Sequence, residues 1–557
     1  MVSAAHKAFC GRSWLLRRLN EPRPWQGDSR ATGTIHLGRT RGRDGRFTLE
    51  YGDRLSTRGS VNFPSVPGSD VFLLGACSAL ILIVHFCVGN GYGFHRDELQ
   101  FLDDARHLQW GYVAYPPVTA FCARIAISLF GISPQVFRLP AAIGNAAVLI
   151  LAGLMARELG GRRPAQVLAL FATFSMTLAT SSLMQYTTFD LLSWSLMIFF
   201  TVRLLRSEEE RYWIGVGVAV GIGILSKYSI AFPVISLVAA LALLPSQRHH
   251  FRSRWFWYGA IAAIIIASPN ILWLARHHFI TLQMEHFIHA RDIREGRTNG
   301  YYADQLKSTL LGFPLAVAGL VSLLRSARFR LLSSFYIGPF VLFAVMRGKG
   351  YYLQPAYPIL YAAGAVALEH VLVSKEKPFR IAVRSVVLAA MLLDAVAIAL
   401  ADLPLRQPGS FGWNWQMKNN RDLADEIGWP EFVAQVAAVR DTLTPDDRSH
   451  LAVLTYNYGE AGALSLYGPL YGLPTPISPV NSFHDRGYGP FAPETLIIVG
   501  SNLQDQQLNF EQCSVGAKVV IPYNVKNEES LDHPEILVCH HLRHPWPKFW
   551  SKAQQFG

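Results

Sequence analysis

A series of long apolar stretches with almost no charged residues constrains this chain more than any other feature of its sequence. Several of them run for about 16 to 25 residues, enough for a helix to cross the roughly 30 Å hydrocarbon core of a bilayer. Only 16% of the 557 residues are charged, whereas soluble domains average about 25%. The chain is therefore predicted to be an α-helical polytopic membrane protein. We count eleven spans, near residues 71–89, 139–156, 164–184, 189–205, 212–226, 229–245, 255–275, 307–324, 331–346, 354–372 and 381–401.

The loops between these spans carry different charges on the two sides of the membrane. If the N-terminus is cytoplasmic, the five inward loops with their flanks hold 16 Lys and Arg residues, at least three in each. The outward hairpins near 185–188 and 227–228 are nearly free of charge. Cytoplasmic loops are enriched in Lys and Arg, so we expect a multi-pass membrane protein with a cytoplasmic N-terminus. The net charge of +12 then follows from topology and predicts no nucleic-acid partner.

Charge also divides the chain into three predicted parts. Residues 1–69 have a net charge of +7 and no sustained apolar period, and we expect a disordered basic cytoplasmic tail. Residues 70–401 hold the spans. Residues 402–557 have a net charge of −6 and, because the number of spans is odd, are predicted to form a soluble extracytoplasmic α/β domain. Its expected elements are strands over 451–455, 495–499, 518–522 and 535–538 and a helix over 429–443.

Two outward loops are long, at residues 90–138 and 276–306. In the first, residues 98–110 and 118–130 have helical periodicity but are too amphipathic or too short to span, which predicts helices along the membrane interface. In the C-terminal domain, Cys513 and Cys539 fall where a disulfide is permitted, but the sequence leaves their pairing open.

Polar residues that could carry chemistry gather on the outward side of the predicted bundle. Asp97 and Glu98 lie in the first outward loop, and Asp190 lies at the outward end of the fourth span. The cationic and phenolic candidates are Lys227, in the turn between spans five and six, and Arg347, Lys349, Tyr351 and Tyr352, after span nine. Ionisable residues at membrane depth are costly and usually line a cavity. Carboxylates at one end of a cavity and cations at the other suit group transfer from an anionic lipid.

The predicted reaction needs few protein groups. No nucleotide-sugar pool is expected outside the cytoplasm, so an activated sugar would arrive on a carrier lipid. A carboxylate can take the proton of the acceptor hydroxyl, a role we predict for Asp97. The departing polyprenyl phosphate needs cations rather than an acid, and Lys349, Arg347 and the tyrosine hydroxyls would hold it.

Each candidate also has a purely structural interpretation. Asp97 and Glu98 could form the solvated face of an interfacial helix, and Asp190 could cap the fourth span. Lys227 could extend its ammonium to the interface, and the cations and tyrosines after span nine could be interfacial anchors. The second outward loop holds His277, His278 and His286 without a compact metal-ligand spacing, so no metal site is predicted there.

Several motifs resemble those of bacterial glycosyltransferase family 39. The first is Gly93-Phe94-His95-Arg96-Asp97-Glu98-Leu99-Gln100-Phe101, followed by Trp110-Gly111-Tyr112 and Tyr115-Pro116-Pro117. Others are Leu225-Ser226-Lys227-Tyr228, Arg347-Gly348-Lys349-Gly350-Tyr351-Tyr352, Pro355-Ala356-Tyr357-Pro358 and Asn457-Tyr458-Gly459-Glu460-Ala461-Gly462-Ala463. This family is related to the dolichyl-phosphate-mannose–protein mannosyltransferases and the lipid A aminoarabinose transferases, all of the GT-C membrane fold.

The resemblance implies an inverting transferase that takes a sugar from polyprenyl phosphate. By this resemblance the catalytic acidic pair corresponds to Asp97, as base, and Glu98, as its neighbour. The resemblance also supports a functional role for Asp190. It matches the Lys/Tyr segment after span nine to the region that contacts the lipid phosphate. The acceptor, whether lipid, glycan or protein, is left open, as is a divalent cation, because related enzymes differ in this. The rival interpretation is a flippase that moves a lipid-linked sugar without bond chemistry.

Overall fold

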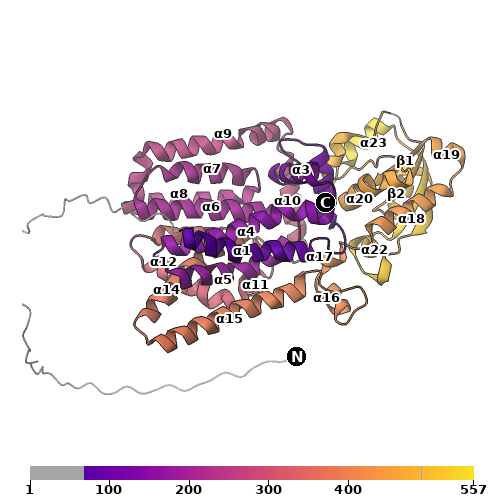
Figure 1. The fold of residues 1–557 in the computed structure, drawn as a ribbon. Helices are drawn as coiled ribbons and strands as arrows, with labels where there is room; N and C mark the ends of the chain where they lie inside the picture. Colours follow the sequence, from indigo (N-terminus) through magenta and orange to yellow (C-terminus); the bar gives the residue numbers. More distant parts are fainter. Residues whose placement is uncertain (1–67, 491) are drawn as a thin grey trace, which may run out of the picture. The chain divides into compact units, whose positions relative to one another are not determined.

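The computed structural model describes residues 68–490 and 492–557, so the predicted tail lies outside the described residues except for Gly68 and Ser69. Helices occupy all eleven predicted spans and lie side by side in a bundle (Figure 1). A helix satisfies its own backbone hydrogen bonds, which lipid cannot do, so apolar stretches of this length fold this way. The bundle helices are α1 (Gly68–Val88), α4 (Pro134–Glu158), α5 (Arg163–Ser181), α6 (Tyr186–Ser207), α7 (Tyr212–Ile224), α8 (Ala231–Leu243), α9 (Arg254–Arg276), α11 (Tyr301–Thr309) continued by α12 (Phe313–Arg325), α13 (Ser334–Val345), α14 (Tyr357–Val373) and α15 (Lys377–Asp402).

Fewer of these helices meet the length and apolarity needed to cross a bilayer. Among the described residues seven do, or eight if α8 and the 3-10 helix η2 (Pro245–Arg252), bent by 110° from it, are one span. Helices α7 and α13 have only 13 and 12 residues. The polytopic helical architecture is thus confirmed, whereas the count of eleven spans stays a prediction.

Both predicted helices of the first outward loop are present. They are α2 (Arg96–Arg106) and α3 (Val118–Phe130). Helix α2 begins with a capping box, in which the His95 side chain accepts from the backbone of the first turn while the Glu98 side chain accepts from the His95 backbone N–H. The second outward loop forms helix α10 (Ile280–Arg294). Of the predicted site residues, Asp97 and Glu98 lie on α2, and Lys349 contacts Asp292 of α10.

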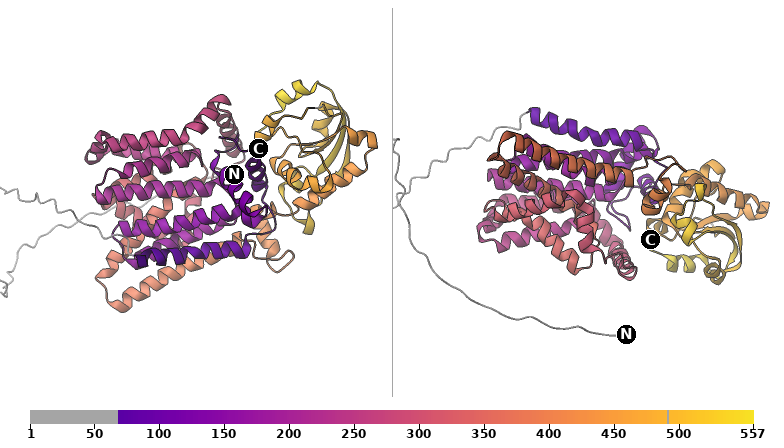
Figure 2. Two further views of the ribbon diagram at one scale, coloured as in Figure 1. Left: turned by 45° about the horizontal axis from the view of Figure 1, so that its top comes forward. Right: turned by 90° about the horizontal axis from the view of Figure 1, so that it is seen from below.

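The C-terminal segment forms a small α/β domain (Figure 2). Its sheet has the order β1-β2-β4-β3, with β1 and β2 parallel and the other two pairs antiparallel. The strands are β1 (Leu451–Thr455), β2 (Thr495–Val499), β3 (Phe510–Lys518) and β4 (Glu535–Leu542). Its helices are α16 (Trp413–Asn419), α17 (Arg421–Ala424), α18 (Trp429–Asp441), α19 (Pro445–Ser449), α20 (Tyr458–Tyr467), α21 (Leu503–Asn509), α22 (Glu528–Asp532) and α23 (Trp546–Ala553).

One predicted strand of this domain is wrong. The third strand covers Phe510–Lys518, and the apolar residues after it leave the sheet before Pro522, which has no N–H to donate to a ladder. Strand β3 is an edge strand with mostly exposed residues, so it lacks the apolar pattern that identifies a buried strand. Cys513 and Cys539 face each other across β3 and β4 and form a disulfide.

Candidate functional site

Asp97 lies in the first turn of α2, with one hydrogen-bond donor on each carboxylate oxygen. The Tyr458 hydroxyl donates to Oδ1 at 2.7 Å, and the Gln185 amide donates to Oδ2 at 3.1 Å. The side chain keeps 30% of its surface exposed. Burial acts to raise the pKa of this carboxyl, but His95, Arg96 and the two hydrogen bonds outweigh it and hold the pKa below its usual value. Asp97 is therefore an accessible carboxylate that is ionised at neutral pH and able to accept a proton.

Glu98, the next residue, is fully buried, and each of its two carboxylate oxygens accepts two hydrogen bonds. Arg138 of α4 binds it through two nitrogens, at 2.9 Å and 2.7 Å. The backbone N–H groups of Met184 and His95 donate to it at 2.7 Å and 2.9 Å. Both carboxylate oxygens are thus committed to holding α2 against α4 and the turn before α6. The geometry favours a positioning role for Glu98 over direct contact with substrate.

Asp190 does not cap the helix that contains it. Helix α6 begins at Tyr186 with Gln185 at the N-cap position, which places Asp190 in its second turn. Its carboxylate accepts from Trp194 Nε1 at 3.0 Å and from Ser229 Oγ at 2.8 Å. The capping interpretation is therefore wrong, and the side chain faces the turn that carries Lys227.

Lys227 sits among aromatic rings at this turn. Its Nζ lies 4.7 Å from the ring centre of Tyr352, 5.3 Å from that of Tyr186 and 5.8 Å from that of Tyr351. These distances are those of cation–π contacts. One pocket is lined by Asp190, Lys227, Tyr351 and Tyr352, together with Met176, Thr180, Thr187, Leu191, Gln354 and Pro355. The fold thus brings four predicted site residues from three distant segments into one pocket.

Arg347 and Lys349 lie outside the lining of this pocket. Lys349 forms an ion pair of 2.7 Å with the buried Asp292 of α10, and Arg347 is exposed. Glu285, also on α10, is close enough to feel Lys227 and Lys349; burial raises its pKa, and the two ammonium groups oppose that shift. Lys349 therefore adds positive charge beside the pocket but already has a carboxylate partner.

Sequence reasoning missed the residues that join Asp97 to the pocket. Gln185 contacts Asp97, and the next residue, Tyr186, contacts Lys227. The sequence feature that could have indicated them is their position in a nearly uncharged hairpin that is predicted to face outward. Tyr458 lies in one of the motifs that resemble the family, but the sequence alone assigns it no role. Arg138 could not be paired with Glu98 from sequence, because the two lie 40 residues apart on different helices.

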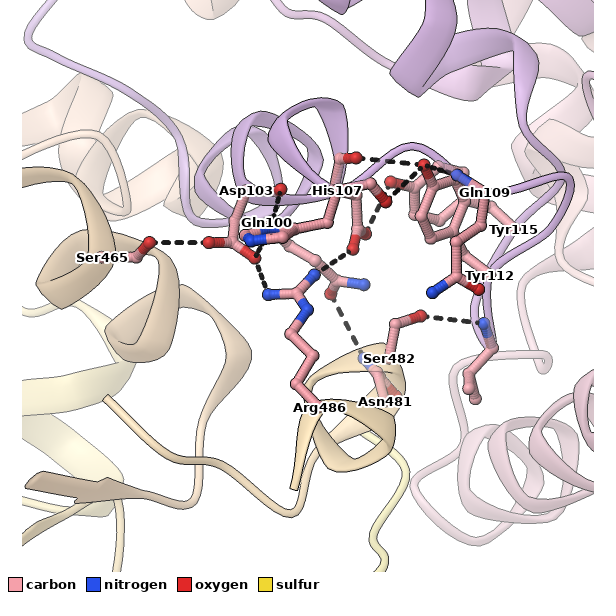
Figure 3. Close-up of polar contacts among 12 residues, drawn as sticks. Gln100, Asp103, His107, Gln109, Tyr112, Tyr115, Ser465, Asn481, Ser482 and Arg486 are labelled. Carbon is pink, nitrogen blue, oxygen red and sulfur yellow. Dashed lines mark hydrogen bonds and ion pairs between the residues drawn. The ribbon is translucent and has the colours of Figure 1, made fainter. Parts of the chain in front are cut away.

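The far end of α2 is held by the C-terminal domain (Figure 3). Arg486 forms ion pairs with both Asp103 and Asp104. Ser465 donates to Asp103 at 2.6 Å, and Asn481 donates to Gln100 at 3.2 Å. Helix α2 therefore bears Asp97 at one end and a polar contact surface for the domain at the other.

No metal cluster is associated with Asp97 in the described part of the chain. The one group of metal-ligating side chains found there is Glu210, His249 and His250, in the predicted inward loops. Its His250 Nδ1 lies 2.9 Å from Glu210, the distance of an ordinary hydrogen bond. The histidines of the second outward loop form no such group among the described residues.

The chain is similar in sequence to known membrane glycosyltransferases. Residues 114–273 match the family described as dolichyl-phosphate-mannose-protein mannosyltransferase. The lipopolysaccharide core galacturonosyltransferase RgtA of Rhizobium johnstonii is 27% identical over 212 residues, and the lipid A galacturonosyltransferase RgtD of the same organism is 28% identical over 205. Each match covers 36% of this chain and 41% of the relative, so less than half of either protein is matched.

The fold is similar to that of a solved enzyme over most of the chain. The crystal structure of ArnT from Cupriavidus metallidurans in the apo state superposes with a TM-score of 0.53 at 12% identity, covering 85% of this chain and 98% of that chain. The same enzyme bound to undecaprenyl phosphate gives a TM-score of 0.50 at 15% identity over the same shares. At such low identity the likeness shows the fold alone. The expected GT-C fold and the resemblance to GT-C glycosyltransferases are thereby confirmed.

Proposed function

We propose that this GT-C membrane protein is an inverting glycosyltransferase. It would move a sugar from a polyprenyl-phosphate carrier to a lipid, glycan or protein acceptor of the cell envelope, on the outer side of the inner membrane. The observation that carries the proposal is the geometry of Asp97. Its ionised, part-exposed carboxylate is connected through Gln185 and Tyr186 to a pocket that is lined by a lysine and two tyrosines.

In this mechanism the Asp97 carboxylate takes the proton of an acceptor hydroxyl. The acceptor oxygen forms a bond to the anomeric carbon as the bond from that carbon to the phosphate oxygen breaks. The bonding electrons leave with the polyprenyl phosphate, and attack from the opposite face inverts the anomeric centre. Lys227, Tyr351 and Tyr352 hold the departing phosphate by charge and hydrogen bonds. Arg347 and Lys349 would contribute positive charge from the adjoining turn, and Asp190 would orient Lys227.

The similar proteins suggest which donors to try first. RgtA and RgtD are galacturonosyltransferases, and ArnT has been solved with undecaprenyl phosphate. A polyprenyl-phosphate carrier of galacturonic acid therefore belongs in the panel beside carriers of neutral hexoses and of pentoses. No cofactor is required by the proposed chemistry, and a divalent cation can be tested by adding a chelator.

The test is transfer of label by the full chain reconstituted in lipid, given labelled polyprenyl-phosphate sugars and an envelope extract. We expect a labelled product that Asp97→Asn reduces by about 10² or more, because a positioned base contributes about that much. Asp441→Asn is the matched control, since Asp441 is an exposed aspartate whose carboxylate is paired only with its neighbour Arg440 among the described contacts. Full transfer by Asp97→Asn would refute the assigned base. Lipid translocation without any labelled product would favour the flippase.

A further inference from the structure

We propose that the C-terminal domain completes the catalytic centre, with Tyr458 as the positioning residue for the Asp97 carboxylate. This inference rests on the proposed role of Asp97 as base. It assigns the domain a part in the chemical step, beyond any part in binding an acceptor. Four observations support it, and they come from different contacts of the domain.

The first observation is how Asp97 is restrained. Tyr458 of α20 and Gln185 at the start of α6 each donate to one oxygen, from segments far apart in the sequence. A carboxylate has two oxygens and about four lone-pair sites, so two donors fix its plane and leave other sites free for an incoming proton. Without the tyrosine hydroxyl, Oδ1 loses its one described hydrogen bond and the carboxylate can rotate.

The second observation is that Tyr458 itself is held in place. The Arg96 guanidinium lies 4.7 Å from the centre of its ring. Arg96 also forms an ion pair with Glu528 of the C-terminal domain. On the other side, the Asn457 side chain caps α20 by accepting from the backbone of Gly459 at 2.7 Å. The ring is therefore fixed from both the membrane domain and its own helix.

The third observation is that two glycines allow α20 to approach α2 closely. A Cβ at Gly462 would lie 2.6 Å from the carbonyl of Leu99, and a Cβ at Gly459 would lie 3.0 Å from the Arg96 side chain. The first distance is too short for any side chain, so this approach requires glycine. The motif Asn457-Tyr458-Gly459-Glu460-Ala461-Gly462 thus has a physical reason, which is to bring the Tyr458 hydroxyl to Asp97.

The fourth observation is that the domain is anchored away from Tyr458 as well. Arg486 pairs with Asp103 and Asp104 at the other end of α2 (Figure 3). The first outward loop and the domain also share one hydrophobic core, in which Leu99, Phe101 and Leu102 pack with residues such as Phe432 and Leu464. A domain held by a shared core and by two polar contacts can fix the position of a hydroxyl.

The decisive variant is Tyr458→Phe, which removes one oxygen and keeps the ring. We expect kcat to fall about tenfold, the order of magnitude for losing a hydrogen bond to a charged group, with the KM for the donor unchanged. Losing a donor that stabilises the carboxylate raises the pKa of Asp97, so the acid limb of the kcat/KM profile moves to higher pH. The titratable or charged groups that face Asp97 are His95, Arg96, Tyr186, Asp425 and Tyr458. Tyr456→Phe is the matched control, because its hydroxyl bonds to Gln506 at 3.4 Å, away from Asp97.

A second measurement keeps the test independent of folding. Incorporating 3,5-difluorotyrosine at position 458 makes the phenol a stronger donor at nearly constant shape, and the acid limb should move to lower pH. If both variants match the control in kcat and in pH profile, the inference is overturned. If Asp97→Asn retains transfer, the assigned base fails instead, and if no labelled product forms with the wild type, the proposed function itself fails, so these failures are distinguishable.

Discussion

At the scale of single residues, the clearest result is that two adjacent carboxylates have different surroundings. Consecutive side chains on a helix point in different directions. Asp97 therefore keeps part of its surface exposed, while Glu98 turns inward onto Arg138. A sequence pattern identifies the acidic pair but cannot separate the two roles, because the separation depends on which side of α2 faces α4.

This difference predicts that two conservative variants affect stability differently. Glu98→Gln leaves the buried Arg138 guanidinium with Glu426, at 3.4 Å, as its one remaining carboxylate partner among the described residues. Removing one partner of a buried ion pair costs roughly 3–5 kcal/mol, so we expect a much lower thermal midpoint for the purified protein in detergent. Asp97→Asn should unfold close to the wild-type midpoint. Equal midpoints for Glu98→Gln and the wild type would contradict the positioning role.

At the scale of elements, the start of α6 does most to assemble the site. Within its N-cap and first two turns it supplies Gln185 to Asp97, Tyr186 to Lys227 and Asp190 to the pocket. Other positions come from the turn before η1 (Tyr228–Ile230) and from η5 (Gly350–Ala356). The sequence predicted that these segments face outward, whereas their meeting depends on how the helices pack.

Because Lys227 lines this pocket and its ammonium lies near three tyrosine rings, we expect it to bind the donor phosphate rather than extend to the membrane surface. Lys227→Met should raise the KM for the polyprenyl-phosphate donor about tenfold or more, since charge-assisted hydrogen bonds contribute about 1.5–3 kcal/mol. Lys307→Met is the matched control, because Lys307 is an exposed lysine paired with Asp304. Steady-state transfer at varied donor concentration measures both. An unchanged KM in Lys227→Met would instead support the interpretation that this lysine extends its ammonium to the membrane interface.

At the scale of the whole molecule, the charge of the loops predicts the orientation in the membrane. The loops predicted to face inward hold the basic residues, and the acidic domain follows the last helix of the bundle. The position of Asp97 beside the C-terminal domain requires both to lie on the same side. The orientation of the membrane domain therefore decides whether Asp97 can reach the proposed acceptors, because these lie outside the cytoplasm.

Cysteine labelling measures the orientation directly. In a variant with Cys10, Cys77, Cys87 and Cys122 replaced by serine, one exposed serine at a time would be changed to cysteine. We expect a membrane-impermeant thiol reagent added outside intact cells to label Ser551→Cys, in the C-terminal domain, but not Ser246→Cys, in a predicted inward loop. The reverse pattern would contradict the predicted topology and place Asp97 in the cytoplasm.

The sequence by itself determined the features that depend on local composition. Apolar length determined the helical membrane domain, loop charge predicted its orientation, and the motif around Asp97 identified the acidic pair and the family that it resembles. Tertiary structure decided which side chains meet. Tyr458 reaches Asp97 across 361 residues, and Lys227 meets Tyr351 and Tyr352 through the packing of separate helices. The physical reason is that hydropathy and periodicity record the surroundings of each segment alone, whereas these contacts depend on how segments remote in the chain approach one another.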